Sequence, residues 1–438
     1  MAISGWFVVL LALGSVPIVL VGGPSALGWW LLGSVLLLVL DLLLAASPRA
    51  LRYTREVPSR LRLGETAETR LLVTNTGRRT VRGVIRDAWQ PSAGVDRMRQ
   101  PLVLPGGERR AITTRLTPIR RGERQAAHVT VRSYGPLRLG ARQTTTRVEG
   151  AVRVLPPFHS RKHLPSRLAR LRELDGQTSV MVRGQGTEFD SLREYVRGDD
   201  VRSIDWRATA RRRDPIQPDA LKLVVRTWRP ERDRRVVILV DSGRTAAARI
   251  ADEPRIDTAF ESSLLLAALA SRAGDRVDLL VYDRRVRGRV QGATGADLLS
   301  RMVDTMAPID PELIEMDWTA VPGLIRSVTS QRALVVVLTS TDSPGGSRGL
   351  LSVLPQLTRK HLVMVASVTD PDVVEATQER ADRHSVYRAA AAERALLDGE
   401  RVASAARQLG AEVVSAAPAD LPPAVADRYI ALKAAGRL

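Results

Sequence analysis

The sequence predicts an α/β domain with a doubly wound, mostly parallel sheet, preceded by a sandwich-like all-β module and an N-terminal transmembrane hairpin. Two long apolar segments lie within residues 1–48, and apolar and polar residues alternate between turn signals over 52–157. Short buried-strand patterns alternate with helical ones over 235–438, and residues 158–234 form a joining segment. A chain of 438 residues is long enough for several separate cores.

The N-terminal hairpin is predicted from apolar segments at about 4–21 and 26–46. A membrane span needs about 20 apolar residues, which the second segment supplies and the first only just reaches. The alternative for the first segment is a cleaved signal peptide. It has neither a basic start nor a small-x-small cleavage site, so we favour two spans.

The charges that flank the hairpin predict its orientation. The loop between the two segments carries no Lys or Arg, whereas Arg49, Arg52 and Arg55 follow the second one. The positive-inside rule therefore predicts a multi-pass protein of the plasma membrane with a cytoplasmic soluble body. Asp41 lies close to the cytoplasmic end of the second span, so we expect it at the membrane interface.

The β module is predicted from strand patterns that end in the turn-forming sequences NTG, PGGE, RRGE and YGP. The patterns cover residues 66–77, 80–89, 109–119 and 126–140. Several short strands with this spacing are typical of a β-sandwich. No reactive cluster accompanies them, so a spacer or adhesion role is expected. In the joining segment, leucines at helical spacing predict an amphipathic helix over 166–176.

The α/β domain is predicted from apolar runs such as VVILVD, which suit parallel strands covered on both faces. The expected strands are 236–241, 276–283, 333–340, 361–370 and 411–416. Helical patterns follow each strand, and the last begins near residue 424. In such a sheet, ligands bind at the carboxyl ends of the strands.

One candidate site lies at those carboxyl ends. Asp241 is the last residue of the first expected strand, Thr245 follows shortly after it, and Asp342 follows the third strand. Oxygen ligands of this kind suit Mg²⁺, although Gly243 stands where a further hydroxyl is expected. The alternative is that Asp241 only caps the next turn. The sequence requires no cofactor, and the absence of cysteine excludes disulfides and thiolate metal sites.

A second candidate is the sequence GGSRG around Ser347, which matches the G-x-S-x-G pattern of a nucleophile elbow. With Asp370 or Asp372 and His384, the chain has the Ser–Asp–His order of a hydrolase. However, STDSP separates the serine from the end of its strand, and Asp372 and His384 are too close in sequence to reach one site from separate strands. A membrane-bound serine hydrolase is therefore kept as the alternative to a non-enzymatic function.

The third feature is EFDSLREYVRGDDVRSIDWRATARR, residues 188–212, in a chain with a formal net charge of +19. Its acids and bases are interspersed, so they can pair locally, and guanidinium neighbours keep carboxylates ionised. A nucleic-acid surface would leave its arginines unopposed, so no nucleic-acid partner is expected. We predict a charge-paired joint anchored on the α/β domain by Tyr195, Ile204 and Trp206. A basic binder of membrane surfaces or nucleic acid is the remaining alternative.

This stretch, followed by VVILVDSG, resembles the signature of the domain-of-unknown-function 58 family. The site residues carried over from the signature are Glu188, Arg193, Tyr195, Gly198, Asp199, Asp200, Arg202, Asp205, Trp206 and Arg211. The resemblance implies a membrane-associated protein with a von Willebrand factor A-like domain, often encoded beside a MoxR-type AAA+ ATPase.

The resemblance also implies a mode of binding. A von Willebrand A domain binds a protein partner through a metal-dependent pattern Asp-x-Ser-x-Ser. Asp241 matches its first position and Thr245 its third, while Gly243 departs from it. The expected function is thus a membrane-anchored, non-enzymatic scaffold or adaptor whose partner is an AAA+ ATPase.

Overall fold

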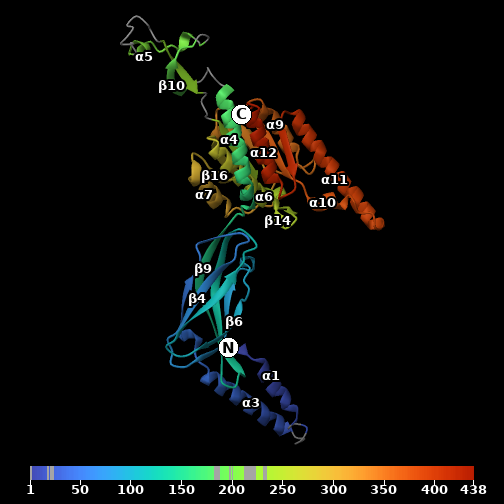
Figure 1. Cartoon of the computed structure of the whole chain (residues 1–438). Coiled ribbons are helices and arrows are strands. Elements are labelled where there is room, and N and C mark those ends of the chain that lie inside the picture. Colours follow the sequence, from blue (N-terminus) through green and yellow to red (C-terminus); the bar gives the residue numbers. More distant parts are fainter. Residues whose placement is uncertain are drawn as a thin grey trace. The chain divides into compact units, whose positions relative to one another are not determined.

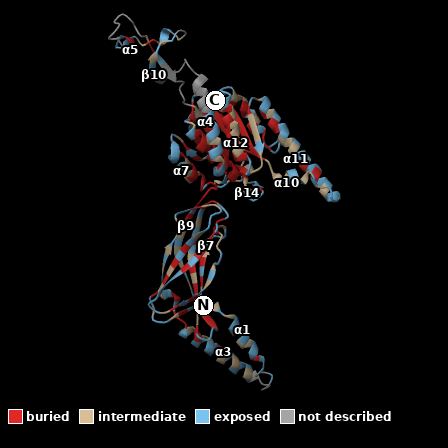
Figure 2. Cartoon of the chain, in the orientation of Figure 1, coloured by how far each residue is buried: buried red, intermediate tan, exposed pale blue. Residues whose placement is uncertain are grey.

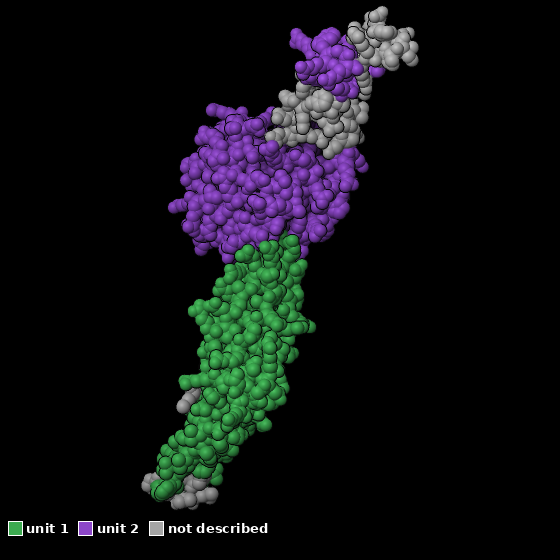
Figure 3. Space-filling model, turned by 90° about the vertical axis from the view of Figure 1, so that its left-hand side faces the viewer, with its two compact units in different colours: residues 1–157 green, residues 158–438 purple. Residues whose placement is uncertain are grey.

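The computed structural model describes residues 2–16, 19, 24–181, 188–196, 199, 201–211, 223–229 and 234–438. Figure 1 gives the order of the elements along the chain. The chain divides into two compact units, Met1–Pro157 and Phe158–Leu438 (Figure 3).

The first unit begins with β1 (Ala2–Ile3), α1 (Gly5–Leu13) and α3 (Pro24–Leu44). Among the described residues, only the helical stretch Ser25–Ala50 is long and apolar enough to cross a membrane, with a mean hydropathy of 2.2. The nine residues of α1 fall short of the length that a span requires. The end of the first apolar segment lies outside the described residues, so the two-span hairpin stays a prediction.

Both ends of this apolar region are attached to the β module. β1 pairs antiparallel with β9, with Ala2 opposite Ala141. At the other end, the carboxylate of Asp41 accepts hydrogen bonds from the backbone N–H groups of Leu137 (2.7 Å), Leu139 (2.9 Å) and Gly140 (3.0 Å). Asp41 is 0% exposed, so it lies buried against the β module.

The β module contains two sheets. Its strands are β2 (Leu51–Glu56), β3 (Arg60–Arg62), β4 (Ala67–Asn75), β5 (Val81–Trp89), β6 (Arg99–Leu104), β7 (Arg109–Leu116), β8 (Gly122–Tyr134) and β9 (Gly140–Leu155). One sheet has the order β1-β9-β8-β5-β6 with β3 beside β9, and the other has the order β2-β4-β7. Apolar side chains of both sheets, such as Val73 and Val131, share one core, as expected of a sandwich.

Arg55 has a structural position inside this module. Its guanidinium forms a bidentate ion pair with Asp87, at 2.7 and 2.8 Å, and lies 5.3 Å from the ring centre of Trp89. The side chain is only 3% exposed. Of the three arginines that follow the apolar helix, Arg49 and Arg52 are therefore the exposed ones.

The second unit begins with a short 3-10 helix (His159–His163) and α4 (Leu164–Met181), which contains the helix expected over 166–176. A small lobe follows. β10 (Glu188–Glu194) pairs antiparallel with β11 (Val224–Arg229), and a 3-10 turn (Val201–Ser203) and α5 (Trp206–Arg211) lie between them in sequence.

The α/β domain contains a six-stranded sheet in the order β16-β15-β12-β17-β18-β19. Its strands are β12 (Arg235–Asp241), β15 (Arg276–Tyr282), β16 (Val286–Val290), β17 (Leu334–Leu338), β18 (Leu362–Val368) and β19 (Glu412–Ala416). All neighbouring pairs are parallel except β15 with β16. The mostly parallel α/β sheet is confirmed, and the antiparallel edge strand β16 is an addition to the prediction.

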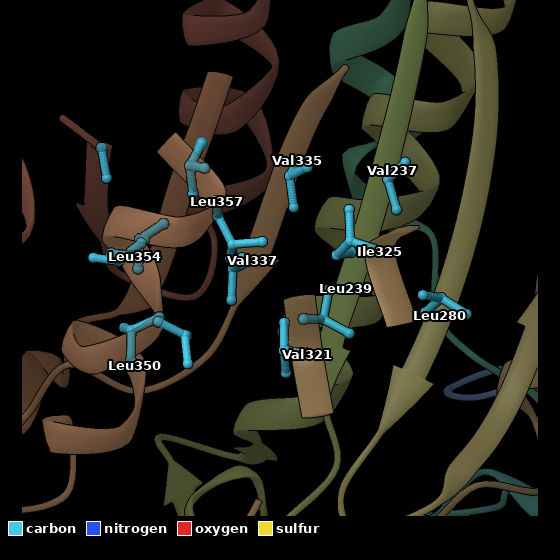
Figure 4. Close-up of a cluster of buried hydrophobic side chains, with 14 of the residues drawn as sticks. Val237, Leu239, Leu280, Val321, Ile325, Val335, Val337, Leu350, Leu354 and Leu357 are labelled. Carbon is cyan, nitrogen blue, oxygen red and sulfur yellow. The ribbon is translucent and has the colours of Figure 1, made fainter. Parts of the chain in front are cut away.

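Helices cover both faces of this sheet. The helices of this domain are α6 (Arg255–Arg272), α7 (Gly295–Met306), α8 (Val321–Val328), α9 (Arg348–Thr358), α10 (Pro371–Ala376), α11 (Arg383–Gln408) and α12 (Leu421–Ala434), and α10 packs against α11. In Figure 4, side chains of α8 and α9 pack with Val237 and Leu239 of β12 and with Val335 and Val337 of β17. Side chains alternate along a strand, so Ile238 and Val240 face the opposite layer, where α6 contacts β12. Figure 2 shows the strands as the buried centre of this domain.

Short elements connect the longer ones in both units. They are the 3-10 turns Pro48–Ala50, Pro91–Ala93, Arg244–Ala247 and Trp318–Ala320, and the two-residue strands β13 (Arg249–Ile250) and β14 (Glu253–Pro254). The turn Arg244–Ala247 and the β13–β14 pair connect β12 to α6. They return the chain so that the first residue of α6 lies beside the end of β12.

Candidate ligand site at the carboxyl edge of the sheet

Asp241 is the centre of the candidate site. It is the last residue of β12 and is 4% exposed. Its carboxylate accepts hydrogen bonds from the Thr339 hydroxyl (2.7 Å), the Thr245 hydroxyl (3.2 Å) and the backbone N–H of Gly243 (2.8 Å). Burial raises the pKa of the Asp241 carboxyl, and these three donors offset the rise in part.

Arg255 is the second charged group of the site. It is the first residue of α6 and is 6% exposed. One terminal nitrogen donates to the carbonyl oxygen of Thr245 at 3.3 Å, and the other forms an ion pair with Asp342. The Nε–H group is buried and has no hydrogen-bond partner among the described residues. The Asp342 side chain is 54% exposed, so this pair joins a buried cation to an accessible anion.

A small cavity lies among these groups. Its volume is about 10 Å³, and its polar lining comes from Asp241, Thr245, Arg255, Thr339 and Ser340. The remaining lining is apolar and includes Ile256, Leu338 and Leu421. A cavity of this size has room for about one water-sized group.

These donors do not fit Mg²⁺ well. Asp241 is the one carboxylate of the cavity lining, and the third residue of the predicted metal set, Asp342, is paired with Arg255. A Cβ atom at Gly243 would lie 2.8 Å from the carbonyl oxygen of Ile314, so the missing hydroxyl residue has no room there. Among the described residues, no three His, Asp or Glu side chains form a metal-binding group.

A second buried acid, Asp283, lies next to the site. It directly follows β15 and is 0% exposed. Its carboxylate accepts a hydrogen bond from the Ser242 hydroxyl at 3.2 Å and lies 3.7 Å from the guanidinium of Arg287. Asp283 and Arg255 are site residues that no motif in the sequence indicates. The signal for Asp283 was the acid that follows each of the first two strands, in VVILVD and LLVYD.

The residues of the proposed nucleophile elbow do not form a triad. Ser347 is 2% exposed and precedes α9, and its backbone N–H donates to the Ser343 carbonyl at 3.1 Å. Asp370 caps α10 by accepting a hydrogen bond from the Asp372 N–H at 3.0 Å. His384 is exposed in the first turn of α11.

The charged stretch does contain local ion pairs. Arg193 and Asp199 form a bidentate pair at 2.6 and 2.7 Å, and the hydrogen bond to Asp199 raises the pKa of Arg193. Asp205 pairs at 2.7 Å with Arg226, which lies outside the stretch, on β11. Gly198 and Asp200 lie outside the described residues, as does the side chain of Glu188. Arg202 and Arg211 are exposed.

The contacts of the apolar residues of this stretch lie within the small lobe, so their predicted anchoring on the α/β domain is not confirmed. Ile204 is 8% exposed and bridges Val225 of β11, while Tyr195 is half-buried. Trp206 is 65% exposed, so its prediction as a buried anchor is wrong. The reason is local: Trp206 opens α5 with its side chain on the outer side, and the buried residue of that helix is Thr209, whose hydroxyl binds the N–H of Val224 at 3.0 Å.

Comparison with known proteins gives a family signal over the second unit. The family model described as "Protein of unknown function DUF58" matches residues 191–378. Uncharacterised proteins of Mycobacterium bovis and Mycobacterium tuberculosis are 26% identical over 204 residues, which is 46% of this chain. The chain spans 61% of the length of these relatives.

Two of the solved structures that are similar to this chain each cover about a quarter of it. A CARDB domain of Pyrococcus furiosus, solved with two metal ions, is 17% identical with a TM-score of 0.18, over 24% of this chain and 91% of that one. A β-glucosidase of Listeria innocua is 18% identical with a TM-score of 0.16, over 24% of this chain and 16% of that one. Similarities of this size carry no functional argument.

Proposed function

We propose that this protein is a membrane-anchored, non-enzymatic scaffold whose α/β domain binds a protein partner at the carboxyl edge of its sheet. The observation that carries the proposal is the set of charged groups gathered there, with buried Asp241 and Arg255 beside the accessible Asp342. Ligands of doubly wound sheets bind at this edge. The rest of the sheet forms a buried, rigid support for it.

The proposal includes a von Willebrand A-like identity for this domain. Two features support it: the central strand β12 ends in the acid that opens the adhesion pattern, and the sheet has one antiparallel strand, β16, at its edge. The departure at Gly243 concerns the metal and leaves the partner surface in place. The partner implied by the resemblance is a MoxR-type AAA+ ATPase.

The membrane anchor is the apolar helix α3, and we propose two spans in all. β1 and the end of α3 are both attached to the β module, which supports a return of the chain to one side of the membrane. Arg49 and Arg52 are exposed directly after α3, which supports a cytoplasmic body. The hydrogen bonds to Asp41 attach the end of α3 to the β module.

Capture of the partner tests the proposal. The full chain, tagged and extracted in mild detergent, is used to recover binding proteins from membranes of its own source cells. We expect one AAA+ ATPase in stoichiometric amount. Arg255→Leu should lose it, whereas Arg301→Leu, which removes an exposed pair with Asp297 elsewhere in the same domain, should retain it. Recovery of no ATPase by the wild type would contradict the proposal.

A further inference from the structure

Arg255 is held as a fixed, desolvated cation. Its side chain is 7% exposed, and one terminal nitrogen is tied to the carbonyl oxygen of Thr245 at 3.3 Å. It begins a helix whose next fifteen residues are all buried. A guanidinium stays charged at any physiological pH, and its planar fork matches a carboxylate. The positive charge at this edge is therefore permanent, and a side chain supplies it.

This guanidinium has unused capacity. Its Nε–H is buried without an acceptor among the residues that the structure describes, which costs free energy unless an acceptor is supplied. Arg255 also lines the cavity of about 10 Å³, which has room for a single oxygen-sized group. The unpaired Nε–H and the lining of the cavity thus belong to the same side chain.

Asp342 is suited to be replaced. Its side chain is 54% exposed and lies in the loop after β17. It engages one terminal nitrogen of Arg255, so a carboxylate that used this nitrogen together with Nε–H would satisfy the guanidinium better. Asp342 thereby occupies the terminal nitrogen of Arg255 that an incoming anion would use.

The size and charge of the site favour a carboxylate over a phosphate group or a divalent metal. The cavity admits about one oxygen, and buried Asp241 next to it disfavours a doubly charged anion. A divalent cation would meet the fixed charge of Arg255, and Gly243 supplies no hydroxyl for it. A single carboxylate carries the one negative charge that the guanidinium can pair with in bidentate geometry.

We propose that Arg255 takes the place of the metal ion in this site: it receives an acidic side chain of the partner directly, and Asp342 occupies it until the partner binds. The proposal rests on the proposed function for the partner's existence. It adds the chemistry of the contact, a carboxylate bound to guanidinium without a divalent metal, and an internal competitor that weakens binding in the free protein.

Acetate is the probe for the test. Thermal unfolding of the full chain in detergent is measured in sodium acetate and in sodium chloride of equal ionic strength, for wild type and Asp342→Ala. A ligand that binds only the folded state raises the Tm in proportion to its occupancy. We expect the acetate shift of Asp342→Ala to exceed that of the wild type about twofold or more. Asp297→Ala removes a similarly exposed carboxylate from a different arginine and should behave like the wild type.

The outcomes separate this inference from the proposed function. Equal acetate shifts in all three proteins would overturn the inference, and so would an EDTA-reversible Mg²⁺ shift that Asp241→Asn abolishes. Adding Arg255→Gln to Asp342→Ala should remove the acetate shift. If that double variant does not fold, the Asp342→Ala and Asp297→Ala comparison still decides. Failure to capture an ATPase would overturn the proposed function and leave the acetate result standing.

Discussion

Asp41 and Asp241 are both buried carboxylates with three hydrogen-bond donors, yet their surroundings differ. The donors to Asp41 are three backbone N–H groups, which can only donate. Two of the donors to Asp241 are the hydroxyls of Thr245 and Thr339, which can also accept. Asp41 is therefore fixed to the loop between β8 and β9. Asp241, in contrast, bonds to hydroxyls that can reorient, and a cavity lies beside it.

This difference separates a structural acid from a candidate site. The loop that binds Asp41 packs tightly against α3. A Cβ atom added at Gly135 or Gly140 would lie within 3 Å of atoms of α3. At the sheet edge, by contrast, Arg255 keeps an unused donor and Asp342 is accessible. Burial and hydrogen-bond number alone do not mark a functional carboxylate.

The largest effect is expected from Asp41→Leu. The change leaves the buried N–H groups of Leu139 and Gly140 and the part-buried N–H of Leu137 without an acceptor, and each buried one costs about 1–3 kcal/mol. We expect the free energy of unfolding of the first unit to fall by about 3 kcal/mol or more. Thermal unfolding in detergent and protease cleavage at residues 135–140 measure it. Asp41→Asn keeps one acceptor oxygen, so its free energy of unfolding should lie between those of the wild type and Asp41→Leu. An unchanged Tm for Asp41→Leu would show that these hydrogen bonds are not formed.

Asp241→Asn should stabilise the protein at pH 7, in contrast to Asp41→Leu. Burial raises the pKa of Asp241 in the folded state, so at pH values between its ordinary pKa and its folded pKa the folded chain retains a proton that the unfolded chain has lost. The stability linked to this group is present below its ordinary pKa of 3.8 and is lost as the pH rises through the folded pKa. Asn removes that loss, so the Tm at pH 7 should rise and its slope with pH should decrease. A lower Tm at pH 7 would argue against this account.

A smaller, local effect is expected from Asp205→Asn in the lobe formed by β10, β11 and α5. Asp205 accepts hydrogen bonds from the N–H groups of Arg207 (2.9 Å) and Ala208 (3.0 Å). The bond from Ala208, followed by that from Arg226, lowers the pKa of Asp205. Its stabilisation is thus present above pH 3.8 and is lost as the pH falls through the lower folded pKa.

Hydrogen exchange of a peptide covering 201–211 tests this effect. Asp205→Asn should exchange faster than the wild type at pH 7, and the two should converge at acidic pH. The exchange of β12 in the same experiment is the internal control, because its residues belong to a separate core. Identical exchange of α5 in both proteins at pH 7 would mean that the cap and the pair contribute nothing.

The smallest effect is expected from Ser347→Ala. The Ser347 side chain makes no capping bond at the start of α9, so the change should cost less than about 0.5 kcal/mol. Partner capture and thermal unfolding should both be unchanged. If the wild type hydrolysed p-nitrophenyl acetate and this variant did not, the serine hydrolase alternative would replace the scaffold.

Much of the fold could be predicted from the sequence, because its strongest patterns come from burial. The run of β12 is buried on both faces, so periodicity exposed it directly. β9 and β16 were missed. Exposed and half-buried residues alternate along the middle of β9, and VRGRV of β16 is short and charged, so neither has a strong apolar pattern. Their strand structure comes from pairing with β8 and β15.

The candidate site could be predicted only where its residues follow a strand. Asp241 and Thr245 stand beside VVILVD in the sequence, and the structure brings them together. Arg255 joins the site through Asp342, which lies 87 positions later, so no local pattern indicates the pair. Pairing of acids and bases within residues 188–212 was predicted, and Arg193 with Asp199 forms such a pair. The partner of Asp205 lies outside the stretch, on β11.

Metal-independent binding through Arg255 is measured as the affinity of the purified full chain for the captured ATPase in the presence of EDTA. We expect the wild type to bind equally well with EDTA and with Mg²⁺, and Arg255→Leu to weaken binding at least about tenfold, as expected for removal of a buried charge partner. Binding that EDTA abolishes, or that Arg255→Leu leaves unchanged, would contradict it.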